Sequence, residues 1–168
     1  TDAVGCSAVD SIFVNQPATG VTTTTSFTPL VCNGDGSGTA TVTAIGGSGN
    51  YTYAWNTTPA QTTATATGLQ AGTYSVTVTD VNGCDYVDAA TVTEPTPVVT
   101  AITMTPASCN GYNDGTATTT PAGGVGNYTY AWSTTPTQTD SIATNLVAGS
   151  YTVTVTDAGG CIGAFTQE

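Results

Sequence analysis

The chain has 168 residues, no lysine, arginine or histidine, and 11 carboxylates, which give it a formal net charge of −11. Binding to nucleic acid and electrostatic docking on anionic lipid both depend on cationic side chains, so this composition excludes them. It also lacks the histidine or lysine that usually activates a nucleophile, so we expect no enzymatic activity and no catalytic residues.

The sequence repeats itself in tandem. Residues 32–84 align without a gap with residues 109–161, at an offset of 77, and 35 of the 53 aligned positions are identical. Near-identical copies predict an array of domains, cut from a longer polypeptide, rather than one catalytic body. We expect the C-terminal strand of a preceding repeat at 1–17, one immunoglobulin-like repeat at 18–95 and a second at 96–168.

Within a repeat, polar and apolar residues alternate as they do in β-strands, and turn residues recur every 8–12 positions. This pattern predicts an all-β fold of tandem immunoglobulin-like or fibronectin-III-like antiparallel β-sandwiches. The run 69–74 resembles a tyrosine corner, and Ile142, Thr144 and Leu146 are expected to share one strand face. In chain order, we expect strands at 20–30, 39–45, 51–55, 63–69, 73–80 and 84–94, and at 97–105 for the opening strand of the second repeat.

Aromatic residues form the triplet Tyr51, Tyr53 and Trp55, which lies on one face of an expected strand. Such a triplet could bind a sugar, but a sandwich needs large residues in its interior, so we assign it to the core. Tyr86 and Tyr112 do not recur in the other repeat and are better candidates for surface contact.

The five cysteines indicate an oxidising, extracellular setting. One pairing lies within each repeat and joins Cys32 to Cys84 and Cys109 to Cys161. The strand order favours another, because it places the two cysteines of a repeat at opposite ends of a sandwich, roughly 20–30 Å apart, whereas a disulfide needs Cα atoms within about 7 Å. Cys32 would then pair with Cys161 across the junction, and Cys6, Cys84 and Cys109 would pair outside this chain.

Four aspartates lie at turns that recur between the repeats, and their hard oxygen ligands would suit calcium. The alternative is that each carboxylate stabilises its own turn through hydrogen bonds, which we prefer. We therefore expect no cofactor, with calcium as the open alternative. The four residues are Asp35, Asp80, Asp114 and Asp157.

The order and spacing of the motifs resemble the SprB repeat family over nearly the whole chain. The motifs are Cys32-Asn33-Gly34, Gly46-Gly47, Tyr51 to Trp55, Leu69 to Cys84, and Glu94-Pro95. That resemblance implies a very long cell-surface adhesin of gliding Bacteroidota, exported by type IX secretion. Asp10-Ser11-Ile12 and Asp140-Ser141-Ile142 also resemble the O-glycosylation signal of that phylum, which makes Ser11 and Ser141 candidate sites.

The resemblance implies a structural and adhesive segment of a secreted filament that serves surface adhesion and gliding motility. The alternative is a glycan-binding module, or the stalk of a secreted multidomain protein. The implied partners are neighbouring repeats, a surface or polysaccharide substratum, and motility machinery reached through other regions of the protein. We expect no membrane insertion, because no apolar run approaches the roughly 18 residues of a membrane span.

Overall fold

A computed structural model describes residues 10–12 and 19–168 of the chain. The strand expected at 1–17 lies for the most part outside the described residues. The described residues form twelve β-strands and no helix, and all strand pairs are antiparallel. The predicted all-β, immunoglobulin-like class is confirmed.

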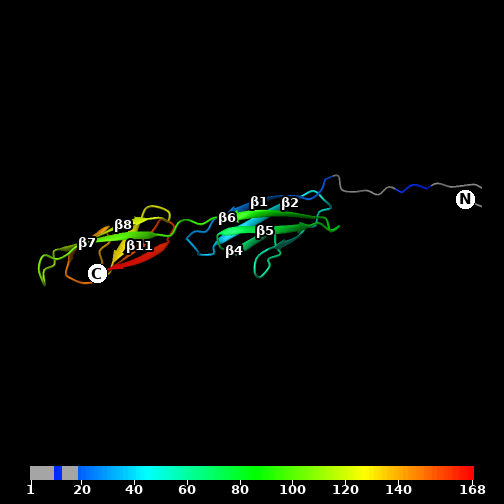
Figure 1. Ribbon diagram of the computed structural model, residues 1–168. Coiled ribbons are helices and arrows are strands. Elements are labelled where there is room, and N and C mark those ends of the chain that lie inside the picture. The colour runs from blue at the N-terminus through cyan, green and yellow to red at the C-terminus, as the bar shows by residue number, and fades with distance from the viewer. Residues whose placement is uncertain (1–9, 13–18) are drawn as a thin grey trace, which may run out of the picture.

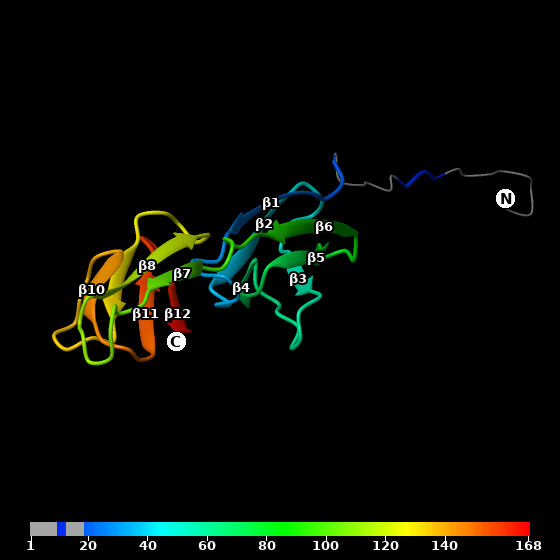
Figure 2. The same ribbon diagram turned by 60° about the vertical axis from the view of Figure 1, so that its left-hand side comes forward.

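The first sandwich consists of two three-stranded sheets that face each other (Figures 1 and 2). One sheet has the order β1-β2-β4 and the other the order β3-β5-β6, a division of strands between two sheets that is typical of immunoglobulin-like sandwiches. The strands are β1 (Thr22–Thr28), β2 (Gly38–Ile45), β3 (Thr52–Trp55), β4 (Thr65–Leu69), β5 (Gly72–Thr79) and β6 (Asp85–Val92).

The second sandwich repeats this topology, with the sheets β7-β8-β10 and β9-β11-β12. Figures 1 and 2 both place it beyond one end of the first, so that the two sandwiches follow each other along the molecule. The boundary expected between residues 95 and 96 falls in the link from β6 to β7. The strands are β7 (Val99–Thr105), β8 (Gly115–Ala122), β9 (Thr129–Trp132), β10 (Ile142–Leu146), β11 (Tyr151–Thr156) and β12 (Ile162–Gln167).

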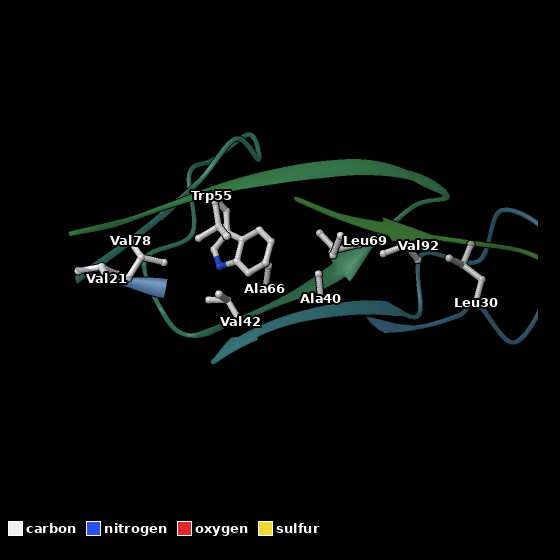
Figure 3. Close-up of a cluster of buried hydrophobic side chains, with 11 residues drawn as sticks. Val21, Leu30, Ala40, Val42, Trp55, Ala66, Leu69, Val78 and Val92 are labelled. Atoms are coloured by element: carbon white, nitrogen blue, oxygen red, sulfur yellow. The ribbon is translucent and has the colours of Figure 1, made fainter. Parts of the chain in front are cut away.

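Each sandwich encloses its own apolar core, built around one tryptophan. Trp55 is 2% exposed, and Figure 3 shows its ring between Val42, Ala66 and Val78. Its indole N–H donates to the carbonyl of Thr63, at 2.9 Å, so the buried polar atom is satisfied. Trp132 occupies the same position in the second core.

The aromatic triplet lies where the sequence indicated. Tyr51 and Tyr53 are half-buried and pack against the core that holds Trp55. The tyrosine corner is confirmed as well, because the Tyr74 hydroxyl donates to the carbonyl of Gln70 at 3.2 Å. Tyr151 makes the same bond in the second sandwich, to Val147 at 3.0 Å. The tyrosines are therefore structural parts of each repeat.

The prediction that Ile142, Thr144 and Leu146 share one face of β10 is wrong. Ala143 and Leu146 point into the core, whereas Ile142 is 45% exposed. The register shifts between Ala143 and Leu146, and Asn145 adopts φ of 56° there. A β-bulge of this kind inserts an extra residue and breaks the simple alternation on which the prediction relied. Gly68, with φ of 68°, is its counterpart in β4.

The termini of several strands also differ from expectation: β1 covers 22–28 rather than 20–30, and β7 begins at Val99 rather than at 97. For two further strands the structure shows a cause. β4 begins at Thr65 rather than at 63, and β6 covers 85–92 rather than 84–94. The carbonyl of Thr63 is taken by the tryptophan N–H, and residues 94 and 95 bond to the loop between β1 and β2. In both places a specific tertiary hydrogen bond replaces regular strand pairing. No helix in the part of the chain that the structure describes is long and apolar enough to cross a membrane.

Candidate functional site

The junction between the two sandwiches is closed by a disulfide bond between Cys32 and Cys161. Cys32 lies in the loop between β1 and β2, and Cys161 immediately precedes β12. Their Cα atoms are 5.4 Å apart, although 129 positions separate them in the sequence. This is the pairing that the strand order favoured over a bond within each repeat.

A carboxylate holds the backbone of Cys161 in place. One oxygen of Asp157 accepts the backbone N–H groups of Gly159 and Cys161, each at 2.8 Å. The other oxygen accepts the N–H of Val125 at 2.7 Å. These backbone hydrogen bonds, that of Val125 foremost, lower the pKa of Asp157 below its ordinary value, because they stabilise the charged form. The turn before β12 is thus fixed by a single side chain.

A second carboxylate organises the loop that carries Cys32. Asp35 accepts the backbone N–H of Cys32 at 2.8 Å, and its other oxygen accepts both the N–H and the hydroxyl of Ser37. These bonds, led by the backbone N–H of Ser37, lower the pKa of Asp35. Both partners of the disulfide therefore sit in turns that an ionised aspartate stabilises.

The link between the sandwiches binds back to the same loop. The N–H of Gly34 donates to the carboxylate of Glu94 at 2.8 Å, and the Asn33 side chain donates to the carbonyl of Pro95 at 3.1 Å. On the other side, the N–H of Gly124 donates to the carbonyl of Thr96 at 2.8 Å. The N–H of Leu30 also donates to the carbonyl of Thr93 at 2.9 Å, so the junction combines one covalent bond with four hydrogen bonds to the link.

The remaining cysteines are placed differently. Cys84 and Cys109 are exposed, and neither has a disulfide partner among residues 10–12 and 19–168. Cys6 lies outside the described residues. That these three pair outside the chain stays a prediction.

The aspartates at the outer ends bind backbone groups, as those at the junction do. Asp80 accepts the N–H groups of Ser48, Asn82 and Cys84, each at 2.9 Å. These bonds, with that of Ser48 first, lower its pKa. No group of three carboxylate, cysteine or histidine side chains within the described ranges could hold a metal ion. The contacts are those of turn-stabilising carboxylates.

Asp114 differs from its expected equivalence with Asp35. By the offset of 77 it aligns with Ser37, and it accepts the N–H of Ser108 at 2.9 Å, just as the Ser37 hydroxyl accepts the N–H of Val31. Hydrogen bonds from Ser108 lower the pKa of Asp114. The two loops thus close the same turn with different side chains.

The candidate glycosylation sites lie in different surroundings. Ser11 is exposed between exposed neighbours, whereas Ser141 is half-buried at the start of β10. The carbonyl of Ser141 accepts the N–H of Thr119 at 2.9 Å, which fixes its backbone in the sheet. Modification of either serine stays a prediction. The two candidate surface tyrosines, Tyr86 and Tyr112, are 46% and 60% exposed.

One feature was not predicted, a shallow pocket that occurs at the same place in both sandwiches. Its volume is about 520 Å³ in the first and about 500 Å³ in the second. The Gln61 amide bonds to both backbone groups of Thr67, each at 2.9 Å, and so shapes the wall. The identity of Thr57-Thr58-Pro59 and Thr134-Thr135-Pro136 in the repeats was the available signal. Six of the lining residues are Thr57, Pro59, Gln61, Thr67, Gln70 and Tyr74.

Comparisons with known proteins gave one family. The model of the SprB repeat matches residues 24–59 and residues 101–137. Among solved structures, the chain is similar to one from "Structural basis for Dscam isoform specificity", at 14% identity and a TM-score of 0.30. That match covers 76% of this chain and 40% of the other. A search of curated proteins found no match.

The two family matches fall on equivalent parts of the two sandwiches, from β1 to the loop after β3 and from β7 to the loop after β9. They confirm the resemblance that the motifs indicated and support a repeat segment of a cell-surface adhesin-like protein. The disulfide fits an extracellular location. Each of the two sandwiches thus contains one segment that matches the SprB repeat.

Proposed function

We propose that this chain is a load-bearing and adhesive segment of a very long cell-surface filament, used in surface adhesion and gliding motility. The filament reaches the surface by type IX secretion, and its parent protein contacts the substratum and the motility machinery. The family match supports the setting, and the disulfide across the junction supports the mechanical role.

The Cys32–Cys161 disulfide is the main support for the mechanical role, because it determines which covalent bonds bear tension. A force applied to the two ends of the chain enters before Cys32 and leaves after Cys161. The disulfide connects these residues directly, so the chain between them is not stretched. That segment includes β2 to β11 and nearly all of both cores. A filament of such units resists extension without requiring exceptionally stable domains.

Adhesion by this segment follows from repetition rather than from one strong site. A surface feature that each repeat presents once is presented many times by a long array, and weak contacts then add up. Absence of cationic side chains favours neutral or hydrogen-bonding substrata over anionic ones. O-glycans on Ser11 and Ser141 would extend the contact surface.

Bead retention under flow tests the adhesive part. Beads that carry the oxidised chain should stay on a neutral polysaccharide surface at shear rates that remove beads carrying an unrelated protein of similar charge. Equal loss of both kinds of bead would contradict the adhesive role. The chain would then be a purely structural stalk, and adhesion would be located elsewhere in the parent protein.

A second candidate is a module that binds a neutral glycan. It is favoured by the pocket that recurs in both sandwiches, lined by the Tyr74 ring, threonine hydroxyls and a proline. Aromatic rings offer an apolar face with a polar edge, which suits the two faces of a sugar. A glycan array probed with the whole chain separates the candidates, because one tight ligand would favour the module.

A further inference from the structure

Each outer end of the molecule carries an exposed cysteine whose counterpart forms the junction disulfide. At the offset of 77, Cys109 corresponds to Cys32 and Cys84 corresponds to Cys161. Cys109 lies in the loop between β7 and β8, and Cys84 immediately precedes β6. We call these the loop end and the turn end. One end of the molecule thus presents one half of a junction, and the other end presents the other half.

The turn end has the geometry that Cys161 has in the junction. One oxygen of Asp80 accepts the N–H groups of Asn82 and Cys84 at 2.9 Å, as Asp157 does at 2.8 Å for its equivalent residues. The N–H of Asp80 donates to the carbonyl of Cys84 at 2.9 Å, and the equivalent bond in the second sandwich measures 3.0 Å. The backbone around Cys84 is therefore held by the same hydrogen bonds as the backbone around Cys161, and Cys84 is exposed.

The loop end also matches its counterpart. The N–H of Tyr112 donates to the carbonyl of Cys109 at 3.1 Å, as the N–H of Asp35 donates to the carbonyl of Cys32 at 3.3 Å. A cavity of about 630 Å³ is lined in part by Cys109 and Asn110 of this loop. The loop end and the turn end therefore both have the turn hydrogen bonds that their counterparts have in the junction.

The sequence differences between the ends do not block the contact. In the junction, Gly159 faces the carbonyl of Val31, and a Cβ atom at Gly159 would lie 3.7 Å from that oxygen, which is ordinary contact. Asn82 replaces this glycine at the turn end, and Ser108 replaces Val31 at the loop end. A Cβ at the glycine position thus lies in ordinary contact with the facing carbonyl, and 3.3 Å from Oδ1 of Asp157 in its own turn.

We propose that Cys109 and Cys84 are the two halves of further junctions, and that the partner of each is another repeat of the same kind. Two copies of this chain would join head to tail, Cys109 of one to Cys84 of the other. Such a contact is heterologous, and where the rotation between copies does not close a ring it continues into a filament. This pairing extends the proposed function, and it rests on that function in assuming that the repeats form a long array.

The bond forms by thiol–disulfide exchange with a small disulfide such as oxidised glutathione. One thiolate attacks the small disulfide, forms a mixed disulfide and releases one glutathione thiol. The second cysteine thiolate attacks the mixed disulfide and releases the other. Two protein thiols and one glutathione disulfide thus become one protein disulfide and two glutathione thiols.

Repetition of this pairing would give the filament two interleaved covalent paths. A path that arrives at Cys84 follows the chain through β6, the link and β7 to Cys109, which is 25 positions further (109 − 84). The path then continues through the proposed disulfide of Cys109 to the turn end of the domain that follows the second sandwich. Residues between Cys32 and Cys84, which hold β2 to β5, lie outside the shortest path. Most of each core would be shielded from tension along the whole array.

A mixing experiment tests this pairing. All proteins carry Cys6→Ser, so that only two exposed thiols remain. The loop-end protein also carries Cys84→Ser, the turn-end protein also carries Cys109→Ser, and one of the two bears a mass tag. They are mixed in equal amounts with oxidised glutathione at high salt, which screens the repulsion between chains of charge −11.

The expected product is the mixed dimer joined through Cys109 and Cys84, in more than the about twofold excess over each symmetric dimer that random pairing of two species gives. The protein with Cys6→Ser alone should form a ladder of head-to-tail oligomers. Random or symmetric dimers would overturn the proposal, as would the absence of dimers in proteins whose Cys32–Cys161 bond is intact by mass spectrometry. None of these outcomes depends on adhesion, which bead retention measures separately.

Discussion

Cys32 and Cys161 lie 129 positions apart in the sequence, yet their Cα atoms are only 5.4 Å apart. One residue belongs to the first sandwich and the other to the second, so the bond fixes a contact that neither core could maintain alone. The turns that hold the two cysteines are each organised by an aspartate, Asp35 and Asp157. The local hydrogen bonds of the two aspartates thus position the cysteines whose bond links the two sandwiches.

Single-molecule stretching should reveal the locked segment directly. In the oxidised chain, pulled from its ends, the residues between Cys32 and Cys161 stay closed. In the Cys32→Ser variant both sandwiches should unfold in sequence and release about 40 nm of additional contour length, because an extended residue spans about 3.3–3.6 Å.

Cys84→Ser is the matched control for that experiment, since it also removes one cysteine but leaves the junction bond in place. Its stretching curves should coincide with those of the unmodified oxidised chain. Full unfolding of both sandwiches in the oxidised control would disprove the load path.

Gly47 and Gly49 offer a matched pair of substitutions in one turn. Both have positive φ, +56° and +70°. A Cβ at Gly47 would lie 2.7 Å from an oxygen of Asp80 and 2.7 Å from Val21, whereas nothing lies within 4 Å at Gly49. Gly49→Ala should cost about 1–2 kcal/mol of backbone strain, and Gly47→Ala about 1–3 kcal/mol more from overpacking.

Denaturant unfolding of the two alanine variants measures the difference between them. Equal destabilisation would mean that the Asp80 turn tolerates displacement, and the account of how that turn is held would then be wrong.

Stability should depend on pH below the ordinary aspartate range. The pKa of Asp80 and of Asp157 is lowered from 3.8 by backbone hydrogen bonds, with those of Ser48 and Val125 first. A carboxylate with a lowered pKa in the folded state contributes stability that is fully present above the unfolded pKa and is lost as pH falls through the folded pKa. Thermal unfolding should therefore show a steady Tm from neutral pH to about 4 and a decline below it.

Asp157→Asn should lower the Tm at neutral pH and flatten the decline in acid, because an amide cannot accept the same bonds with both of its terminal atoms. Asp85→Asn, at an exposed carboxylate on β6, should retain the original profile. If the Asp157 variant kept the full acid decline, that carboxylate would not be its source.

Removal of divalent cations should leave stability unchanged. The oxygens of Asp80 and Asp157 are engaged by backbone N–H groups, which stabilise the turns without a metal. Calorimetric scans in excess chelator and in excess calcium are therefore expected to superimpose. A rise of the Tm with calcium would reinstate these carboxylates as ligands.

Regular alternation made much of the fold predictable. Trp55, Val76 and Val78 are buried as the period of two requires, and the tyrosine corner at Tyr74 follows from its local motif. The disulfide partner of Cys32 followed from the strand order, because the order determines which loops share an end.

Other features depend on contacts that alternation does not encode. The bulge at Asn145 arises from one left-handed residue that moves Ile142 outward and Ala143 inward. Bonds from the link to the loop, such as that of Glu94 to Gly34, require the two segments to meet in three dimensions. The recurring pocket is likewise formed by two loops that only the folded sandwich brings together.

Peptide mapping under non-reducing conditions tests the central assignment most directly. The chain has no lysine or arginine for trypsin, so pepsin at low pH, which also suppresses disulfide exchange, is the suitable protease. The expected result is a cross-linked peptide pair that contains Cys32 and Cys161. A pair that joins Cys32 to Cys84 would contradict it, and with it the covalent junction between the sandwiches.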